Sequence, residues 1–222
     1  MKHVLLTTLI LLSAHYFSIG QQQKEVKLSA VPHAFEWLNT PKSYTVTSGN
    51  SIQIVAQAKT DQYIALDGSY YVNNAPKLLF TPDSNFIFSA RLSTTFDSVY
   101  DAGAILLYSD SSNWAKLLFE RSDEHTIHVS SSVIKNKITD DSYHAALTTK
   151  QVYIKVATAG NMFCFYYSAD GKQWNIVRTF AYNKTNMRLG FYAQSPKGPQ
   201  CTVKFADISY KPHGFTNFFT GE

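Results

Sequence analysis

The chain has 222 residues, of which 16% are charged, and its formal net charge is +4. The charges are spread along the sequence without the basic run that marks nucleic-acid binding, so no nucleic-acid partner is expected. With 14 Tyr and 15 Phe, the chain is too rich in aromatic residues for a disordered protein and has the composition of β-strands.

The first 20 residues have the three parts of a signal peptide. Lys2 and His3 form a basic start, an apolar run of nine residues follows at 4–12, and residues 18–20 (SIG) place small side chains where a signal peptidase cuts. The run is shorter than the ~20 apolar residues that cross a bilayer. A buried N-terminal helix is the alternative. We therefore predict cleavage after Gly20, no membrane insertion, and a secreted or periplasmic protein.

A polar lead-in is expected at 21–32, one domain at 33–212, and a C-terminal tail at 213–222 whose phenylalanines could pack back onto the body. Turn signals such as Asp170-Gly171, which tolerates the positive φ of a hairpin, separate short segments of strand character. No segment has the period of an amphipathic helix. The pattern predicts an all-β sandwich or barrel, with strands at 44–47, 51–56, 85–91, 102–108, 113–120, 126–132, 152–158, 162–168, 174–180, 187–193 and 202–210.

The sequence lacks the motifs of common catalytic sites. A glycosidase needs two facing carboxylates, which on one strand would stand two residues apart, and no such pair occurs. Asp140 and Asp141 are neighbours and would point to opposite faces of an extended segment. His125 and His128, three residues apart, would also face opposite sides, which disfavours a metal site. We therefore expect no catalytic residue, no bound metal and no cofactor.

The strand predicted at 113–120 combines two different faces. Ala115, Leu117 and Phe119 form a small apolar face suited to a sandwich core. The other face carries Trp114, Lys116, Leu118 and Glu120, and its charged groups would be costly to bury without a purpose. This face is either an ordinary solvated surface with a Lys–Glu pair or a ligand surface.

Several motifs, in this order and spacing, resemble the DUF1349 family, also called regulation-of-enolase-like proteins, of the concanavalin A-like lectin/glucanase superfamily. The resemblance covers about residues 33–210, and W-x-K-x-x-x-E at 114–120 and S-x-D-G-x-x-W at 168–174 are its most specific parts. The family often has Trp in place of Tyr63 and Ser-Asp-Trp in the region of 140–143, so ligand preference cannot be carried over. The motifs are 35–39 (FEWLN), 60–63 (TDQY), 101–108 (DAGAILLY), 113–120 (NWAKLLFE), 167–174 (YSADGKQW), 189–196 (LGFYAQSP) and 203–205 (VKF).

The resemblance implies a two-sheet antiparallel jelly-roll sandwich of the concanavalin A-like kind. Strands 102–108, 113–120, 126–132 and 187–193 would form the concave sheet, and strands 85–91, 152–158, 162–168, 174–180 and 202–210 the other. Cys164 and Cys201 would then lie on separated strands, too far apart for a disulfide. Tyr108 and Tyr192 would join Trp114, Lys116 and Glu120 as ligand-binding residues on the exposed concave face.

Three functions remain open. The first is an exported, non-catalytic binding module that holds an oligosaccharide or polysaccharide in the concave groove, since aromatic rings stack on sugars and polar groups bind hydroxyls. The second is a glycoside hydrolase or lyase whose carboxylates come from loops, with Glu120 and either Asp101 or Asp61. The third is a structural module that docks another exported protein through the same groove.

Overall fold

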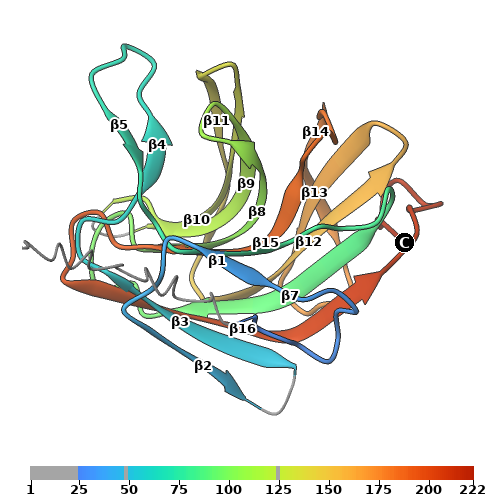
Figure 1. The fold of residues 1–222 in the computed structure, drawn as a ribbon, viewed down its shortest axis with the longest axis horizontal. Helices are drawn as coiled ribbons and strands as arrows, with labels where there is room; N and C mark the ends of the chain where they lie inside the picture. The colour runs from blue at the N-terminus through green and yellow to red at the C-terminus, as the bar shows by residue number, and fades with distance from the viewer. Residues whose placement is uncertain (1–24, 48–49, 124–125) are drawn as a thin grey trace, which may run out of the picture.

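The structure, a computed structural model, describes residues 25–47, 50–123 and 126–222. The predicted signal peptide at 1–20 and His125 lie outside these residues. The described part is all-β, with two seven-stranded antiparallel sheets packed face to face and a separate two-stranded hairpin (Figure 1). The predicted two-sheet antiparallel sandwich is therefore confirmed. No helix among these residues is long and apolar enough to cross a membrane.

The first sheet, called the concave sheet below, curls upward at the end formed by β9, β10 and β11 (Figure 1). It contains the four strands that the family resemblance assigned to the concave side, and these four stand next to one another. In spatial order its strands are β1 (Glu36–Leu38), β6 (Lys77–Phe80), β15 (Arg188–Gln194), β8 (Ala102–Asp110), β9 (Asn113–Arg121), β10 (Ile127–Lys135) and β11 (Ile138–Leu147).

The second sheet, called the outer sheet, contains all five strands that the resemblance assigned to it. The remaining two strands of the structure, β4 (Gln62–Ile64) and β5 (Tyr71–Asn73), pair only with each other as a hairpin. In spatial order the outer sheet runs β14 (Asn175–Ala181), β13 (Met162–Ser168), β12 (Gln151–Ala159), β7 (Ile87–Thr94), β16 (Gln200–Lys211), β3 (Ser51–Gln57) and β2 (Ser43–Thr47).

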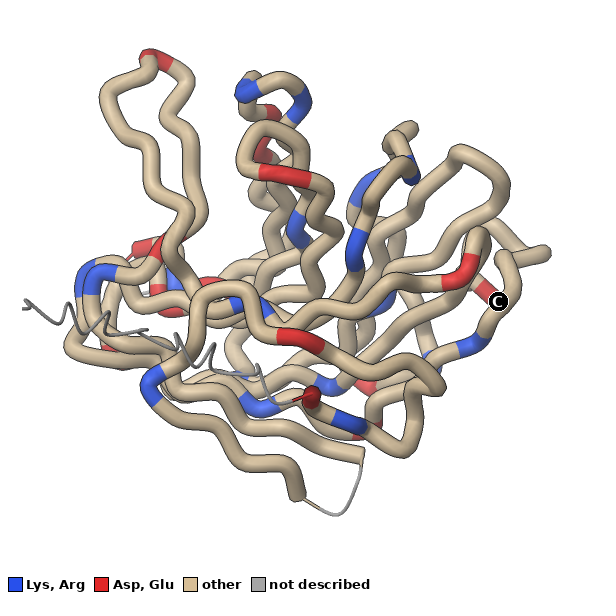
Figure 2. The backbone as a smooth tube through the Cα atoms, in the orientation of Figure 1, with Lys and Arg blue, Asp and Glu red and all other residues tan. Residues whose placement is uncertain are grey.

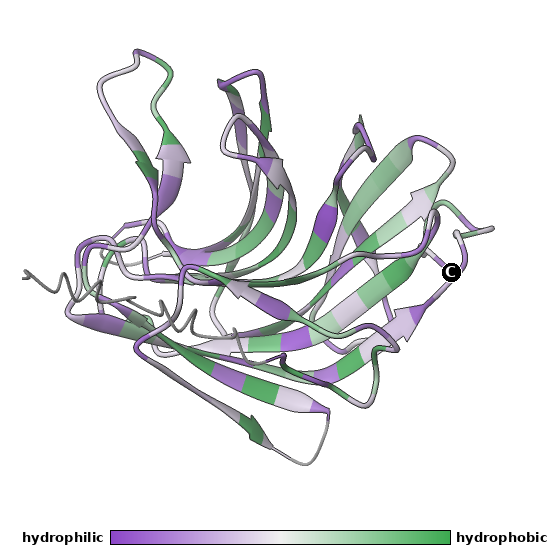
Figure 3. Cartoon of the chain, viewed as in Figure 1, coloured by the Kyte–Doolittle hydropathy of each residue, from purple (hydrophilic) through white to green (hydrophobic). Residues whose placement is uncertain are grey.

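The core lies between the two sheets and is filled by alternate side chains of each strand. Figure 3 shows hydrophobic and hydrophilic residues alternating along the outer strands. On β9, Leu117 and Phe119 are fully buried in this core, as predicted. Phe191 of the concave sheet packs on Phe205 of the outer sheet with ring centroids 4.3 Å apart. Because each such side chain stabilises by about 1.5–3 kcal/mol when buried, this contact zone holds the sheets together.

Five strands of the structure, β1, β4, β5, β6 and β11, are absent from the sequence-based prediction. The strand β11 shows why. It has one buried residue, Thr139, while Asp140, Asp141 and Tyr143 are exposed. Such an edge strand has no alternating hydrophobic pattern, so its strand conformation follows from pairing with β10 and not from its composition.

The lead-in belongs partly to the domain, which corrects the predicted boundary at residue 33. Val26, Leu28 and Val31 are at most 5% exposed and pack in the main core. The backbone of Val26 also pairs with that of Phe35. The predicted polar lead-in at 21–32 therefore supplies core side chains from residue 26 onward.

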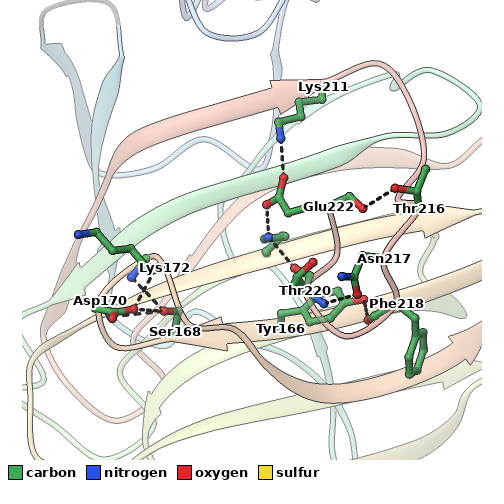
Figure 4. A network of polar contacts seen from close by, with 12 residues as sticks. Tyr166, Ser168, Asp170, Lys172, Lys211, Thr216, Asn217, Phe218, Thr220 and Glu222 are labelled. Carbon is green, nitrogen blue, oxygen red and sulfur yellow. Dashed lines mark hydrogen bonds and ion pairs between the residues drawn. The ribbon is translucent and has the colours of Figure 1, made fainter.

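The C-terminal tail lies against the solvent side of the outer sheet (Figure 4). The Glu222 carboxylate accepts hydrogen bonds from the ammonium groups of Lys155 and Lys211, at 2.5 Å each. The Tyr166 hydroxyl donates to the carbonyl oxygen of Phe218 at 2.8 Å. Lys155 is almost fully buried beneath the tail, with its ammonium 3.8 Å from the centre of the Trp174 ring. The tail thus covers a charged and aromatic patch that would otherwise be open.

The two cysteines are unpaired and buried, as predicted. Cys164 lies on β13 and Cys201 on β16, with β12 and β7 between them. Since neighbouring strands are ~4.8 Å apart, the two Cα atoms are well beyond the about 7 Å limit for a disulfide.

Figure 2 shows that charged residues of both signs are scattered over the sheets and hairpins and are not gathered on one face.

Candidate functional site

A cavity of about 300 Å³ opens on the side of the concave sheet that faces away from the core. Its floor comes from β9, one wall from β10 and β11, and the opposite wall from the β4–β5 hairpin. In Figure 1 the hairpin and the curled strands rise from the sheet on either side. The volume is at the lower end of the range for small-ligand pockets, so the cavity can hold a small molecule.

The base of the hairpin is held by hydrogen bonds around Asp61. The backbone carbonyl oxygen of Asp61 accepts hydrogen bonds from the backbone N–H groups of Asn74 and Ala75. The backbone N–H of Asp61 donates a hydrogen bond to Oδ1 of Asn74 at 2.8 Å. The Asp61 carboxylate accepts from the backbone N–H of Gln62 at 2.7 Å and from the Tyr70 hydroxyl at 3.2 Å. These contacts place both Asp61 and Tyr70 in the cavity wall.

Lys116 anchors the floor of the cavity and is 2% exposed. Its ammonium donates to the carbonyl oxygen of Gln62 at 2.7 Å and to Oε1 of Gln194 at 3.5 Å. The same ammonium lies 5.3 Å from the centre of the Trp114 ring and 5.2 Å from that of Tyr192. A buried charge needs such partners, and two aromatic rings within about 6 Å supply cation–π attraction in addition.

Glu120 lies beside Lys116 on the cavity floor and is 8% exposed. It accepts a hydrogen bond from Nε2 of Gln194 at 3.3 Å. Burial raises the pKa of Glu120 to about 7, because Lys116 only partly offsets it and the nearby carboxylates of Asp61 and Asp141 raise it further. Near neutral pH, Glu120 therefore exists in both its protonated and its ionised form.

The wall formed by β11 contributes Asp141 and Tyr143, and the hairpin contributes Tyr63 across from them. Burial, with Asp141 nearby, raises the pKa of Tyr63 to about 12, and burial raises that of Tyr143 to about 12. Both hydroxyls thus stay protonated at neutral pH and can donate hydrogen bonds. Asp140 instead forms an ion pair with Arg178 at 2.6 Å, so the prediction that Asp140 and Asp141 face opposite sides is confirmed.

All five predicted ligand-binding residues are buried, so their predicted exposure is wrong, and three of the five do not line the cavity. Tyr108, Trp114 and Tyr192 are on the predicted face of the sheet, but they are 7%, 1% and 0% exposed and do not line the cavity. The hairpin and its flanking loop cover them, and they pack with Ile64 and Ala75 in a second hydrophobic cluster. The concave face is therefore partly filled by the chain itself.

Lys116 and Glu120 do line the cavity, together with residues that sequence reasoning did not assign to it. Tyr63 and Tyr143 are the clearest of these. Both lie where the chain departs from the pattern of the resembled family, and this departure was the one feature of the sequence that could have pointed to them. Asp61, predicted only as a possible carboxylate for hydrolysis, also lines the cavity, although it lies more than 50 residues before Glu120 in the sequence.

Asp101, the other carboxylate considered for hydrolysis, does not line the cavity. It is fully buried and accepts hydrogen bonds from Oγ of Ser195 at 2.8 Å and from the backbone N–H of Ser98 at 2.9 Å.

His128 is half-buried and hydrogen-bonds with Ser122. In the part of the chain that the structure describes, no three His, Cys, Asp or Glu side chains lie close enough to hold a metal ion.

Comparison with known proteins agrees with the motifs found in the sequence. The profile of the family described as "Protein of unknown function (DUF1349)" matches residues 37–213. The chain is 26% identical over 175 residues to "Regulation of enolase protein 1" of Saccharomyces cerevisiae, covering 78% of this chain and 87% of that protein.

Solved structures share the sandwich. A functionally unknown protein from Saccharomyces cerevisiae superposes with a TM-score of 0.74 at 24% identity, covering 84% of this chain and 98% of that one. The structure described as "Bacteroides ovatus Xyloglucan PUL GH43B" superposes with a TM-score of 0.64 at 14% identity, covering 90% of this chain but 41% of that one. At these identities the likeness shows the concanavalin A-like sandwich fold and nothing about activity.

The buried position of Trp114 makes a direct test of this site possible. Trp114→Ala should destabilise the protein by about 3–5 kcal/mol, because it removes a large side chain from a packed cluster. Tyr143→Ala, which changes an aromatic residue that is 61% exposed, should change the free energy of unfolding by no more than about 0.5 kcal/mol. Urea unfolding of both variants beside the wild type measures the difference. Equal stability of the two variants would contradict the packing described for Trp114.

Proposed function

Because the chain belongs to the DUF1349 family, whose description assigns no activity, we propose from the cavity itself that this protein is an exported, non-catalytic module that binds carbohydrate. The observation that carries the proposal is the set of tyrosines from two separate hairpins, Tyr63, Tyr70 and Tyr143, around a floor of fixed charged groups. Aromatic faces beside hydrogen-bonding groups suit the C–H faces and hydroxyls of a sugar ring.

The electrostatics of the floor support binding of a polyhydroxy ligand. Lys116 and Gln194 are held in place by their own hydrogen bonds, so little side-chain freedom is lost when a ligand arrives. Glu120 and Asp61 supply acceptors, while the protonated hydroxyls of Tyr63 and Tyr143 supply donors. Sugar hydroxyls act as both donors and acceptors, which such a mixed lining can satisfy.

Removal of one tyrosine from the wall should weaken binding without harming the fold. After a glycan array has identified a ligand, Tyr143→Ala should lower its affinity by about 2 kcal/mol, or roughly 30-fold, as expected for an aromatic anchor. The matched control is Tyr71→Ala, since Tyr71 is 52% exposed on the hairpin but lies outside the cavity lining. Calorimetry should find this control unchanged. An array on which the wild type retains no glycan would favour docking of a protein partner instead.

Export is the second part of the proposal and rests on residues 1–20. The secreted or periplasmic protein should begin at Gln21, because the small residues at 18–20 suit signal peptidase. N-terminal sequencing of material recovered outside the cytoplasm measures this. An intact Met1 or Lys2 on a cytosolic product would contradict the proposed localisation.

A hydrolase or lyase is the second candidate function, and Glu120 is the observation in its favour. A buried carboxyl whose pKa is raised to about 7 has the property of a general acid. Glu120→Gln keeps the size of the side chain but cannot transfer a proton. If the protein only binds, the wild type should leave the retained glycan intact and the variant should keep measurable affinity. Cleavage by the wild type that Glu120→Gln abolishes would establish the enzyme instead.

A further inference from the structure

We propose that the cavity selects carbohydrate with free, positively charged amino groups over neutral or acidic sugars; this preference rests on the proposed carbohydrate function. The ligand class would include oligomers of glucosamine.

Three carboxylates line the cavity, and they come from three different elements. Asp61 stands at the base of the hairpin, Glu120 on β9 and Asp141 on β11. In the described ranges, none of the three has a Lys, Arg or His nitrogen within the 4 Å of an ion pair, although Asp140, the neighbour of Asp141, does. The cavity therefore gathers negative charge that the protein leaves without a direct counter-charge.

The positive charges of the lining are placed differently. The ammonium of Lys116 is already bound by the Gln62 carbonyl and lies between two aromatic rings. Lys197 is exposed at the edge. By contrast, the Glu120 carboxylate accepts one hydrogen bond among the described residues, at 3.3 Å, while an ionised carboxylate can accept about four. The Glu120 carboxylate can thus accept further hydrogen bonds, and a ligand with N–H donors would supply them.

The remaining lining also favours a cation. Tyrosine ring faces attract ammonium groups by about 0.5–2 kcal/mol, and the walls present the rings of Tyr63, Tyr70, Tyr100 and Tyr143.

An ammonium on a sugar ring in the cavity would thus lie near carboxylates from three elements and near tyrosine side chains. Charge-assisted hydrogen bonds are roughly twice as strong as neutral ones, which gives a charged amine an advantage over a hydroxyl at the same position. An N-acetylated amine would lose this advantage, because acetylation removes the charge. A uronic acid would be repelled by the same carboxylates.

Calorimetry at pH 7, where Glu120 is partly ionised and the glucosamine amine partly charged, tests the inference with four oligosaccharides of equal length: glucosamine, N-acetylglucosamine, glucose and uronic acid oligomers. The glucosamine oligomer should bind at least tenfold more tightly than the N-acetylated one, a difference of about 1.4 kcal/mol. Asp141→Asn should reduce this ratio to about threefold or less. The matched control Asp140→Asn changes the adjacent residue on the opposite face, and should keep the full ratio.

The outcomes separate the two proposals. If the neutral or acidic oligomer binds as tightly as the glucosamine oligomer, the amine preference is overturned while carbohydrate binding stands. If none of the four binds and the glycan array is also blank, the proposed function fails. If Asp140→Asn lowers the ratio as much as Asp141→Asn does, the preference arises from general surface charge and not from the cavity. Thermal melts of both variants exclude loss of folding as the cause.

Discussion

The buried ammonium of Lys116 links three parts of the structure that are far apart in sequence. It stands on β9, donates to the backbone of the β4–β5 hairpin at Gln62 and lies against Tyr192 of β15. By holding the hairpin down on the concave sheet, this group closes the space over Trp114. Because an ammonium buried without partners would be very costly, the hairpin cannot lift away cheaply. This contact therefore attaches the cavity wall to the sheet beneath it.

The same contact explains why the concave face is divided into two zones. Toward one side, Tyr108, Trp114 and Tyr192 are packed into a small hydrophobic cluster under the hairpin. Toward β11, the floor stays open and carries Glu120 with its raised pKa. A carboxyl that is buried and has no ion pair works against stability in its charged form. Retention of such a group at the bottom of an accessible cavity is the feature that separates this surface from an ordinary sheet face.

Tyrosines supply the aromatic part of the cavity walls. Tyr63 and Tyr143 line opposite walls, in two stretches where the sequence departs from the pattern of the resembled family. Tyrosine keeps an aromatic face but adds a hydroxyl that can donate a hydrogen bond. The sandwich thus supplies the floor of the site, while the hairpin and β11 supply the residues of its walls.

Sequence alone determined the strands whose side chains alternate between the two layers. Alternation on β9 separated Leu117 and Phe119 in the core from Lys116 and Glu120 on the other face, because a period of two directly encodes which face is buried. The family resemblance added the order of the sheets and hence the unpaired cysteines. Lys116 and Glu120 could be found in this way because their strand has a strong pattern of its own.

What only the tertiary structure decided is which of the residues on that face remain open. Trp114 and Lys116 have the same position in the alternation, yet the first is covered and the second reaches the cavity. The cover comes from the hairpin and the opposite wall from β11, two segments with no alternating hydrophobic pattern. Asp61 and Asp141 likewise line the same cavity as Glu120 only because the fold brings their segments together. Burial of a side chain depends on all the segments that pack over it, and the local sequence pattern does not encode which distant segments these are.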